Sequence, residues 1–160
     1  MRLSVIAIGR MKSGPERELV ERYLKRCRAS GPAIGWQGFE VSEFSESRKN
    51  TAPLRKSEEA KAILGTLPTG ASLIALDEAG SNWTSEKFAL NIARLSEQGT
   101  GHLGFVIGGP DGLAESVRSS AAHVLSFSPL TWPHQLVRIM LAEQLYRATT
   151  ILAGHPYHRS

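Results

Sequence analysis

Residues 103–113, LGFVIGGPDGL, join an apolar segment to a glycine-rich turn. Leu103–Ile107 has the length and the aliphatic and aromatic composition of a buried strand, and the glycine- and proline-rich residues 108–112 end it. A short helix is expected from Leu113. An apolar strand followed by a helix is typical of a parallel sheet with helices on both faces.

The same alternation of strand and helix extends in both directions from this stretch. Short apolar segments predict four further strands, at residues 3–9, 33–44, 72–76 and 124–127. The spacing of apolar residues predicts longer helices at residues 15–30, 54–67, 84–98 and 133–152. No internal repeat or linker divides the sequence, so we expect one α/β domain over residues 1–160 with a mainly parallel sheet.

Composition places the chain among ordinary folded proteins. Its 160 residues are 41% hydrophobic and 21% charged, which excludes the disordered, collagen-like and coiled-coil classes. The apolar runs are too short to span a membrane and no cleavage signal follows the first residues, so we expect a cytoplasmic protein without a membrane partner. Cys27 is the single cysteine, which excludes an intrachain disulfide and a cysteine-rich zinc site.

Positive charge is distributed unevenly. The net charge is +4, but Arg2–Arg28 contains many more basic than acidic residues. A second basic cluster comprises Arg48, Lys49, Arg55, Lys56 and Lys61. Two interpretations are open: a positive face that contacts a polyanion such as RNA, or solvated helix surfaces.

Three loops follow predicted strands directly: Leu76–Gly80, Ile107–Gly112 and Phe127–His134. In parallel α/β sheets ligands bind at the carboxyl ends of the strands, so these loops form the candidate binding site. The glycine-rich loop lacks the spacing of dinucleotide and P-loop motifs, which disfavours both ligands and leaves a tight turn as the alternative. The third loop has apolar side chains and restrained amides, which suit either a flat heterocycle such as adenine or simple helix packing.

The C-terminal stretch concentrates residue types that perform chemistry. It contains His155, Tyr157, His158 and Arg159. Together they supply a proton acceptor, a stacking face and a phosphate contact, a combination that suits a nucleotide substrate. The alternatives are a disordered end or a zinc site with His134. No Cys or acidic residue completes a recognisable ligand set, so we expect no metal.

Several motifs occur in a specific order: Arg2–Gly9, Leu76–Asp77, Ile107–Leu113, Leu130–His134, Leu136–Arg138, Ala142–Ala148 and His155–Arg159. Over nearly the whole chain this order resembles the ribosomal RNA large-subunit methyltransferase H family of SPOUT methyltransferases. The resemblance implies a SPOUT-type trefoil-knotted α/β fold. It also implies a homodimer that methylates N3 of a pseudouridine in 23S rRNA of the assembled 70S ribosome, with S-adenosylmethionine as cofactor and no metal.

The same resemblance assigns cofactor binding to residues of the three loops. They are Leu76, Gly108, Phe127, Ser128, Pro129, Leu130, Thr131 and Trp132. The family usually has aliphatic residues where this chain has Phe127 and Trp132. We expect these two side chains to pack around the adenine or beside it.

The candidate catalytic residues come from the C-terminal stretch. N3 of a uracil ring carries a proton at neutral pH, so methyl transfer requires a base, and neutral His158 is the first candidate. We expect Tyr157 to stack on or orient the ring, and Arg159 to hold a phosphate or the charge on the uracil carbonyls. His134 is expected to fix its loop, and His155 to dock the tail.

The last predicted helix carries more apolar surface than one core-facing stripe, at Leu136, Val137, Ile139, Met140, Leu141, Leu145 and Ile151. We therefore expect a homodimer through this helix, in which one subunit's tail can complete the other's pocket. Three alternatives to the function stay open: a non-catalytic ribosome- or RNA-binding protein, a SPOUT methyltransferase for tRNA or another rRNA nucleotide, and a metal-dependent hydrolase.

Overall fold

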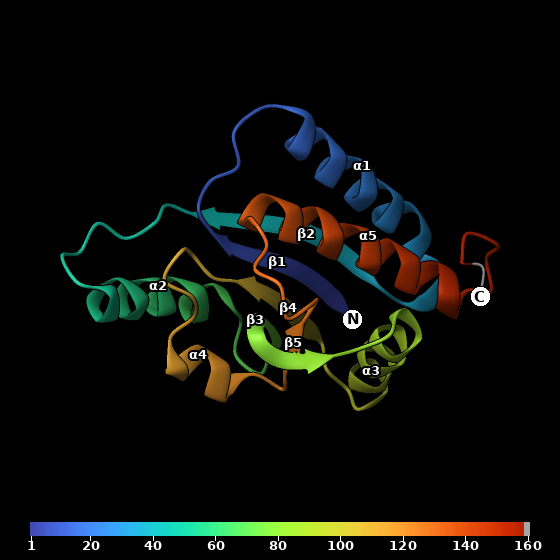
Figure 1. Ribbon diagram of the computed structural model, residues 1–160. Helices are drawn as coiled ribbons and strands as arrows, with labels where there is room; N and C mark the ends of the chain where they lie inside the picture. The colour runs from blue at the N-terminus through green and yellow to red at the C-terminus, as the bar shows by residue number, and fades with distance from the viewer. Residues whose placement is uncertain (159–160) are drawn as a thin grey trace.

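Five parallel strands form one sheet in the computed structural model, which describes residues 1–158 (Figure 1). The strands are β1 (Arg2–Ile8), β2 (Gln37–Phe44), β3 (Ser72–Asn82), β4 (His102–Ile107) and β5 (His123–Ser126). Their order across the sheet is β2-β1-β4-β3-β5, and each neighbouring pair is parallel. All the carboxyl ends therefore lie at one edge, which brings together the loops that follow the strands.

Helices cover both faces of this sheet. They are α1 (Pro15–Ser30), α2 (Ala52–Thr66), α3 (Ser85–Glu97), α4 (Glu115–Ser120) and α5 (His134–Leu152), with a short 3-10 helix, η1 (Gly31–Ile34), after α1. α1, α3 and α5 lie on one face, and α2 and α4 lie on the other (Figure 1). The predicted α/β layers are confirmed. The trefoil knot stays a prediction, because the order of the strands does not define how the chain is threaded.

Two hydrophobic cores follow from the alternation of side chains along β1. Leu3, Val5 and Ala7 belong to the core under α1, α3 and α5, whereas Ile6 and Ile8 belong to the core under α2 and α4. An inner strand of a parallel sheet is buried on both faces, so apolar side chains are needed at both odd and even positions. This explains why β1 has a nearly continuous apolar sequence.

The ends of α3 and α5 agree with the sequence. The Thr84 hydroxyl accepts a hydrogen bond from the Lys87 amide at 3.2 Å and so caps the start of α3. α5 begins after Pro133, and Gly154 follows its end with a φ of 66°. Glycine adopts this left-handed conformation readily, which makes it a common residue just after a helix.

β2 begins later than the sequence predicts. Residues 31–34 form η1 instead of the start of a strand, and Gly35 with a φ of 74° ends this turn. β2 then starts at Gln37. The apolar residues before it were compatible with either structure, because short apolar runs do not distinguish a strand from a helical turn.

β3 is longer than predicted, so part of the expected loop Leu76–Gly80 is extended strand. Its pairing with β5 is irregular between Leu76 and Ser81 and then resumes. A Cβ on Gly80 would lie 2.6 Å from the backbone carbon of Leu125. Glycine at this position therefore lets the two backbones approach closely enough for the pairing to resume.

Candidate functional site

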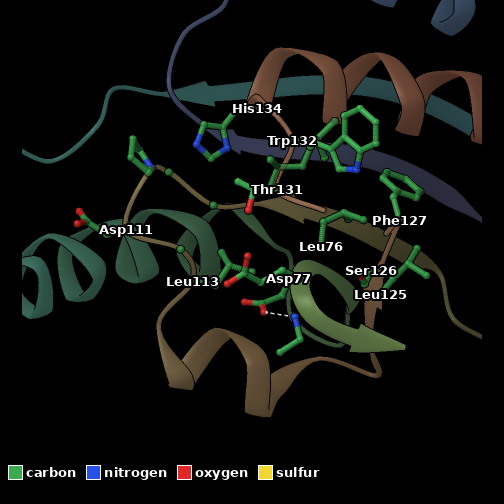
Figure 2. A pocket seen from close by; sticks show the side chains of 18 of the residues that line it. Leu76, Asp77, Asp111, Leu113, Leu125, Ser126, Phe127, Thr131, Trp132 and His134 are labelled. Atoms are coloured by element: carbon green, nitrogen blue, oxygen red, sulfur yellow. Dashed lines mark hydrogen bonds between the residues drawn. The ribbon is translucent and has the colours of Figure 1, made fainter. Parts of the chain in front are cut away.

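A cavity of about 390 Å³ lies at the carboxyl ends of β3, β4 and β5, beside the first turn of α5 (Figure 2). All three predicted loops contribute to its wall. Cavities of roughly 300–1,000 Å³ with apolar walls and a few polar groups are typical small-molecule sites. This cavity is therefore the candidate binding site.

Two glycines of the loop after β4 lie too close to their neighbours to carry a side chain. A Cβ on Gly109 would lie 2.9 Å from Ile8 Cγ2, and a Cβ on Gly108 would lie 3.0 Å from Leu113 Cδ2. The Gly112 amide donates to the Gly109 carbonyl at 2.9 Å, and Gly112 has a φ of 80°. The loop is both a tight turn and one wall of the cavity.

An ion pair joins this loop to α2. Arg55 donates from Nε to Asp111 Oδ2 at 2.6 Å and from Nη2 to Asp111 Oδ1 at 2.9 Å, so the contact is bidentate. The same guanidinium donates from Nη1 to the Lys49 carbonyl at 3.0 Å. The hydrogen bond from Arg55 lowers the pKa of Asp111. Arg55 thus connects the glycine-rich loop with the basic segment that precedes α2.

Two carboxyl groups lie on the β3 side of the cavity. Asp77 Oδ1 accepts from the Ala79 amide at 3.0 Å, and Asp77 Oδ2 lies 3.7 Å from Arg118 Nη1. Glu78 is exposed and also lines the cavity. Carboxylates in the wall suit a ligand that carries hydroxyl groups or positive charge.

Serine hydrogen bonds fix the loop after β5. Ser126 Oγ donates to the Ser128 carbonyl at 2.8 Å, and Ser128 Oγ accepts from the Leu130 amide at 2.9 Å. Leu130 and Trp132 stay 65% and 38% exposed next to the cavity. Their position offers an apolar contact to a bound ligand.

The structure brings most of the predicted cofactor-binding residues to this cavity. The lining includes Leu76, Gly108, Phe127, Ser128, Leu130, Thr131 and Trp132. Pro129 belongs to the same loop but does not line the cavity. Lys56 and Arg118 were missed: they reach the wall from α2 and α4. Neither residue follows a strand directly, so the rule that ligands bind after strand ends does not identify them.

The predicted catalytic tail packs along the second half of α5, against α3. The Tyr157 hydroxyl donates to Glu143 Oε1 at 3.2 Å, and His158 Nε2 lies 3.0 Å from Glu86 Oε1. Burial, followed by the Glu143 charge, raises the pKa of Tyr157 to about 12. Nδ1 of His158 is buried without a hydrogen-bond partner among residues 1–158. Arg159, the third candidate, lies outside the described residues.

The tail and the cavity are separated within one chain. None of residues 154–158 lines the cavity. Tyr157 contacts α5 through Glu143 and through Arg147, whose guanidinium lies 5.1 Å from the centre of the tyrosine ring. These two residues follow His134, which lines the cavity, by roughly 14–20 Å along the helix axis. The predicted base and the predicted cofactor site therefore do not meet in one subunit.

The histidines do not converge on a metal site. His134 lines the cavity, whereas His155 Nδ1 accepts from the Tyr157 amide at 3.1 Å in the tail. Residues 1–158 contain no cluster of three or more His, Cys, Asp or Glu side chains placed to bind a metal ion.

In the same part of the chain, no helix is both long and apolar enough to cross a membrane.

A second cavity of about 390 Å³ lies between α1, α3 and α5. Its wall is mostly apolar and includes Tyr23, Trp83, Phe88, Phe127, Ile139 and Met140. Phe127 lines both cavities, so the two are neighbours. Near the start of α5, Leu136 is 40% exposed. The additional apolar surface that the sequence predicts for the last helix is therefore only partly covered in one chain.

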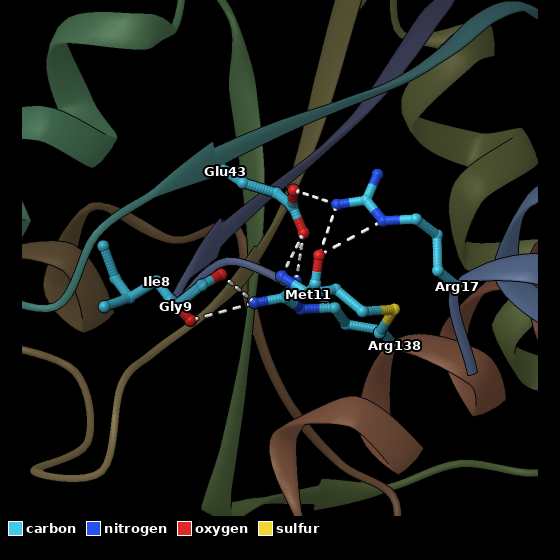
Figure 3. Close-up of polar contacts among 6 residues, drawn as sticks. All are labelled: Ile8, Gly9, Met11, Arg17, Glu43 and Arg138. Carbon is cyan, nitrogen blue, oxygen red and sulfur yellow. Dashed lines mark hydrogen bonds and ion pairs between the residues drawn. The ribbon is translucent and has the colours of Figure 1, made fainter. Parts of the chain in front are cut away.

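A buried charge network anchors the first half of α5 to the strand ends (Figure 3). Arg138 is 5% exposed and donates to Glu43 Oε1 at 2.6 Å and to the Ile8 carbonyl at 3.0 Å. Glu43 also accepts from the Met11 amide at 2.9 Å and from Arg17 Nη2 at 2.8 Å. Burial acts to raise the pKa of Glu43, but the Met11 amide and the two guanidinium groups together lower it. The network holds the first half of α5, whose residues His134 and Val137 line the cavity, against the ends of β1 and β2.

Comparison with known proteins places the chain in a family. A family model described as Predicted SPOUT methyltransferase matches residues 1–158. The protein named Ribosomal RNA large subunit methyltransferase H of Brucella anthropi is 57% identical, and that of Bradyrhizobium diazoefficiens is 51% identical, each with 100% of both chains covered. The solved SpoU methyltransferase AviRb from Streptomyces viridochromogenes, in complex with AdoMet, is 12% identical with a TM-score of 0.42, covering 96% of this chain and 61% of that one. The family model and the full-length relatives show that this chain belongs to the SPOUT methyltransferases and, within them, to the ribosomal RNA large subunit methyltransferase H family.

Proposed function

We propose that this protein transfers a methyl group from S-adenosylmethionine to N3 of a pseudouridine in 23S rRNA of the assembled ribosome. Its family consists of methyltransferases, and its full-length relatives are named for large-subunit ribosomal RNA. The structural observation that supports the proposal most directly is the cavity between three loops at the carboxyl ends of β3, β4 and β5.

The residues around the cavity suit S-adenosylmethionine. Leu76, Phe127 and Trp132 offer apolar surface to the adenine ring. Asp77 offers a carboxylate to the hydroxyl groups or to the positive charge of the cofactor. Gly108 lines the cavity without a side chain, so a ligand can approach its backbone.

Proton removal is the chemical task left to the protein. S-adenosylmethionine supplies an electrophilic methyl group, whose bond to sulfur breaks as its bond to N3 forms. The cavity loops hold the reacting groups in line and exclude water, while a base takes the proton from N3. We assign this step to the tail.

His158 is the proposed base, because a neutral imidazole accepts protons near neutral pH. Tyr157 stacks on or orients the uracil ring, and Arg159 holds a phosphate or the charge that develops on the uracil carbonyls. In the resting arrangement Glu86 occupies Nε2 of His158, and Nδ1 is buried. The tail therefore has to leave Glu86 before His158 accepts the substrate proton.

A second copy of the chain supplies the tail in this proposal. In one chain, the residues that hold the tail, Glu143 and Arg147, lie roughly 9–15 Å along α5 beyond Val137, which lines the cavity. The apolar cavity between α1, α3 and α5 lies directly beside the cofactor cavity and offers a surface for another subunit. A homodimer through α5 covers this surface and brings each tail to the other subunit's cavity, where His134 fixes the loop.

Methyl incorporation tests the reaction. Labelled S-adenosylmethionine is offered with 70S ribosomes, separated 50S and 30S subunits, and bulk tRNA, and the modified nucleoside is identified by mass. We expect label in 23S rRNA as N3-methylpseudouridine. Label only in tRNA would overturn the substrate and keep methyl transfer. No label in any substrate, together with no cofactor binding, would favour a non-catalytic RNA-binding protein.

Mixed dimers test the shared site. Two differently tagged subunits, one carrying His158→Ala and the other Gly108→Val, are co-expressed, and the doubly tagged dimer is purified. Its expected activity is about half that of the wild type, because one of its two sites combines an intact cavity with an intact tail. Activity no higher than that of either variant alone would place each tail at its own cavity.

A further inference from the structure

Two basic loops lie at the same edge of the sheet as the cofactor cavity. Residues 9–14 follow β1 and residues 45–51 follow β2, and both leave carboxyl ends because the strands are parallel. Figure 1 shows both segments at the end of the molecule where α5 begins. β1 lies directly beside β4, whose following loop lines the cavity.

The loop after β1 has a backbone held by hydrogen bonds and two exposed basic side chains. Met11 is 7% exposed, whereas Arg10 and Lys12 on either side of it are exposed. The Met11 amide donates to Glu43 at 2.9 Å, and its carbonyl accepts from Arg17 at 2.6 Å. Neither Arg10 nor Lys12 forms an ion pair with any residue of the described chain.

The segment after β2 is held in a similar way. The Ser47 amide donates to Oε1 of the buried Glu59 at 2.9 Å. Arg48 and Lys49 next to it are exposed. Lys49 Nζ lies 3.9 Å from Glu58, and such an exposed pair contributes little, so Lys49 stays available to another anion.

Lys56 extends this positive surface from α2 into the wall of the cavity. Most carboxylates of the same edge already have partners: Glu43 is held by two arginines, and Asp111 by Arg55. Glu46, Glu58 and Glu78 stay exposed. The cations, which we call the basic rim, are Arg10, Lys12, Arg48, Lys49 and Lys56.

The basic side chains of α1 lie elsewhere. Arg28 pairs with Glu21 at 3.3 Å near the far end of the helix. Arg22 and Lys25 are exposed, but they follow the start of α1 by roughly 10–15 Å along its axis. The uneven charge of the N-terminal third therefore divides into a rim at the cavity edge and a helix surface that leads away from it.

We propose that the basic rim binds the phosphate backbone of the RNA substrate and that Arg22 and Lys25 do not. The inference rests on the proposed function and names the surface through which the substrate docks. Because the backbones of both loops are already held by hydrogen bonds, binding has to order only the basic side chains, and contact with the RNA backbone releases its counterions. Because Lys56 continues the rim into the cavity, a bound strand can deliver one nucleotide to the cofactor.

Salt-dependent binding of the full chain to 70S ribosomes tests the rim. Arg10→Ala/Lys12→Ala is compared with Arg22→Ala/Lys25→Ala, which removes the same charge from α1. The rim variant is expected to bind about tenfold more weakly or worse, with the slope of log K against log salt reduced by about 2. The α1 variant is expected to match the wild type. Unchanged cofactor affinity in both variants confirms that the cavity is folded.

Four outcomes separate the possibilities. A rim variant with the wild-type slope, or an α1 variant with an equal loss, would overturn the inference. A rim variant that loses binding only to vesicles of phosphatidylserine and phosphatidylcholine would assign the rim to a membrane surface and also overturn it. The proposed function fails on a different result, namely a wild-type protein that binds ribosomes through the rim but methylates no RNA.

Discussion

The two halves of α5 hold different parts of the proposed reaction. In the first half, Arg138 and Glu43 bind the helix to the strand ends, next to a cavity whose loops are fixed by their own hydrogen bonds. In the second half, Glu143 holds Tyr157, while Glu86 of α3 holds His158. The first half borders a cavity that one chain completes. The second half holds Tyr157 and His158, which do not line that cavity in the described chain.

In the proposed reaction, cofactor binding and proton removal therefore depend on separate groups of residues. Variants near the cavity are expected to change cofactor affinity or stability. Variants in the tail are expected to change turnover.

Removal of the candidate base is the strongest test. His158→Ala is expected to lower turnover by roughly 10²- to 10⁴-fold, the usual contribution of a positioned base. Cofactor affinity, measured by calorimetry, is expected to stay near the wild-type value because His158 does not line the cavity. Glu86→Gln is the matched control. It removes the exposed carboxylate that contacts His158 and is expected to keep turnover within about threefold. Wild-type turnover in His158→Ala would exclude this histidine from the mechanism.

Glu43→Gln is expected to lower the free energy of unfolding, because Glu43 anchors the first half of α5. The change leaves the buried Arg138 guanidinium without its counter-ion, and breaking a buried pair costs about 3 kcal/mol of unfolding free energy. Urea unfolding at pH 7 measures the loss. Glu40→Gln removes the exposed partner of Arg2 and is expected to cost less than about 1 kcal/mol. Equal losses for the two variants would show that the buried network does not anchor α5.

Acidification is expected to remove the stabilisation that ionised Glu43 gives the wild type. Its pKa is lowered in the folded protein from an ordinary value of 4.5. The ionised carboxylate therefore stabilises the fold fully above that value, and this stabilisation is lost as the pH falls through the lower folded pKa. The difference in unfolding free energy between the wild type and Glu43→Gln should be constant near pH 7 and shrink below about pH 4.5. A difference that grows on acidification would contradict the assigned direction.

A single methyl group added to the glycine-rich loop is expected to lower the affinity for the cofactor and to leave the tail unchanged. In Gly108→Ala the new Cβ lies 3.0 Å from Leu113 Cδ2, so the loop has to shift. Overpacking of this size costs about 1–3 kcal/mol, which as a loss of binding free energy corresponds to a cofactor affinity reduced by roughly 5- to 160-fold. Gly65→Ala on α2 is the control, because its Cβ meets nothing within 4 Å. An unchanged dissociation constant for Gly108→Ala would remove this loop from the cofactor site.

Cys27 of α1, which contacts the middle of α5 at Ala142, is expected to be unreactive. Burial raises the pKa of its thiol to about 12, and Sγ donates to the Ala142 carbonyl at 3.8 Å. We expect no reaction with maleimide until the protein opens. His158→Ala should label as slowly as the wild type, and Glu43→Gln faster. Rapid labelling of the wild type would show that α1 and α5 separate readily.

Features set by neighbouring residues could be predicted from the sequence. The short apolar run of residues 3–9 predicts β1, and the spacing of apolar residues in 84–98 predicts α3. Strand limits set by distant contacts could not be predicted. The return of β3 to the sheet depends on the close approach of Gly80 to Leu125, which lies far along the chain.

Some features of the candidate site could likewise be predicted from the sequence, and others could not. The rule for strand ends locates the loops of Leu76, Gly108 and Phe127, because parallel topology alone brings them together. The rule does not predict the ion pair between Arg55 and Asp111, because this pair forms only when α2 packs against the loop after β4. The chemistry of the tail is visible in its residue types. Its distance from the cavity is set by where the tail docks on α5, which no motif specifies.

The inner position of β1 has a consequence for synthesis. Arg2 of β1 pairs with His102 of β4, a strand made about 100 residues later. At translation rates of about 5–20 residues per second, the first strand waits about 5–20 s for this neighbour. The larger core stays open longer still, because it also needs Leu141 and Leu145 of α5. The nascent chain therefore exposes apolar sequence while the later strands are made, and it completes this core only after α5 has been synthesised.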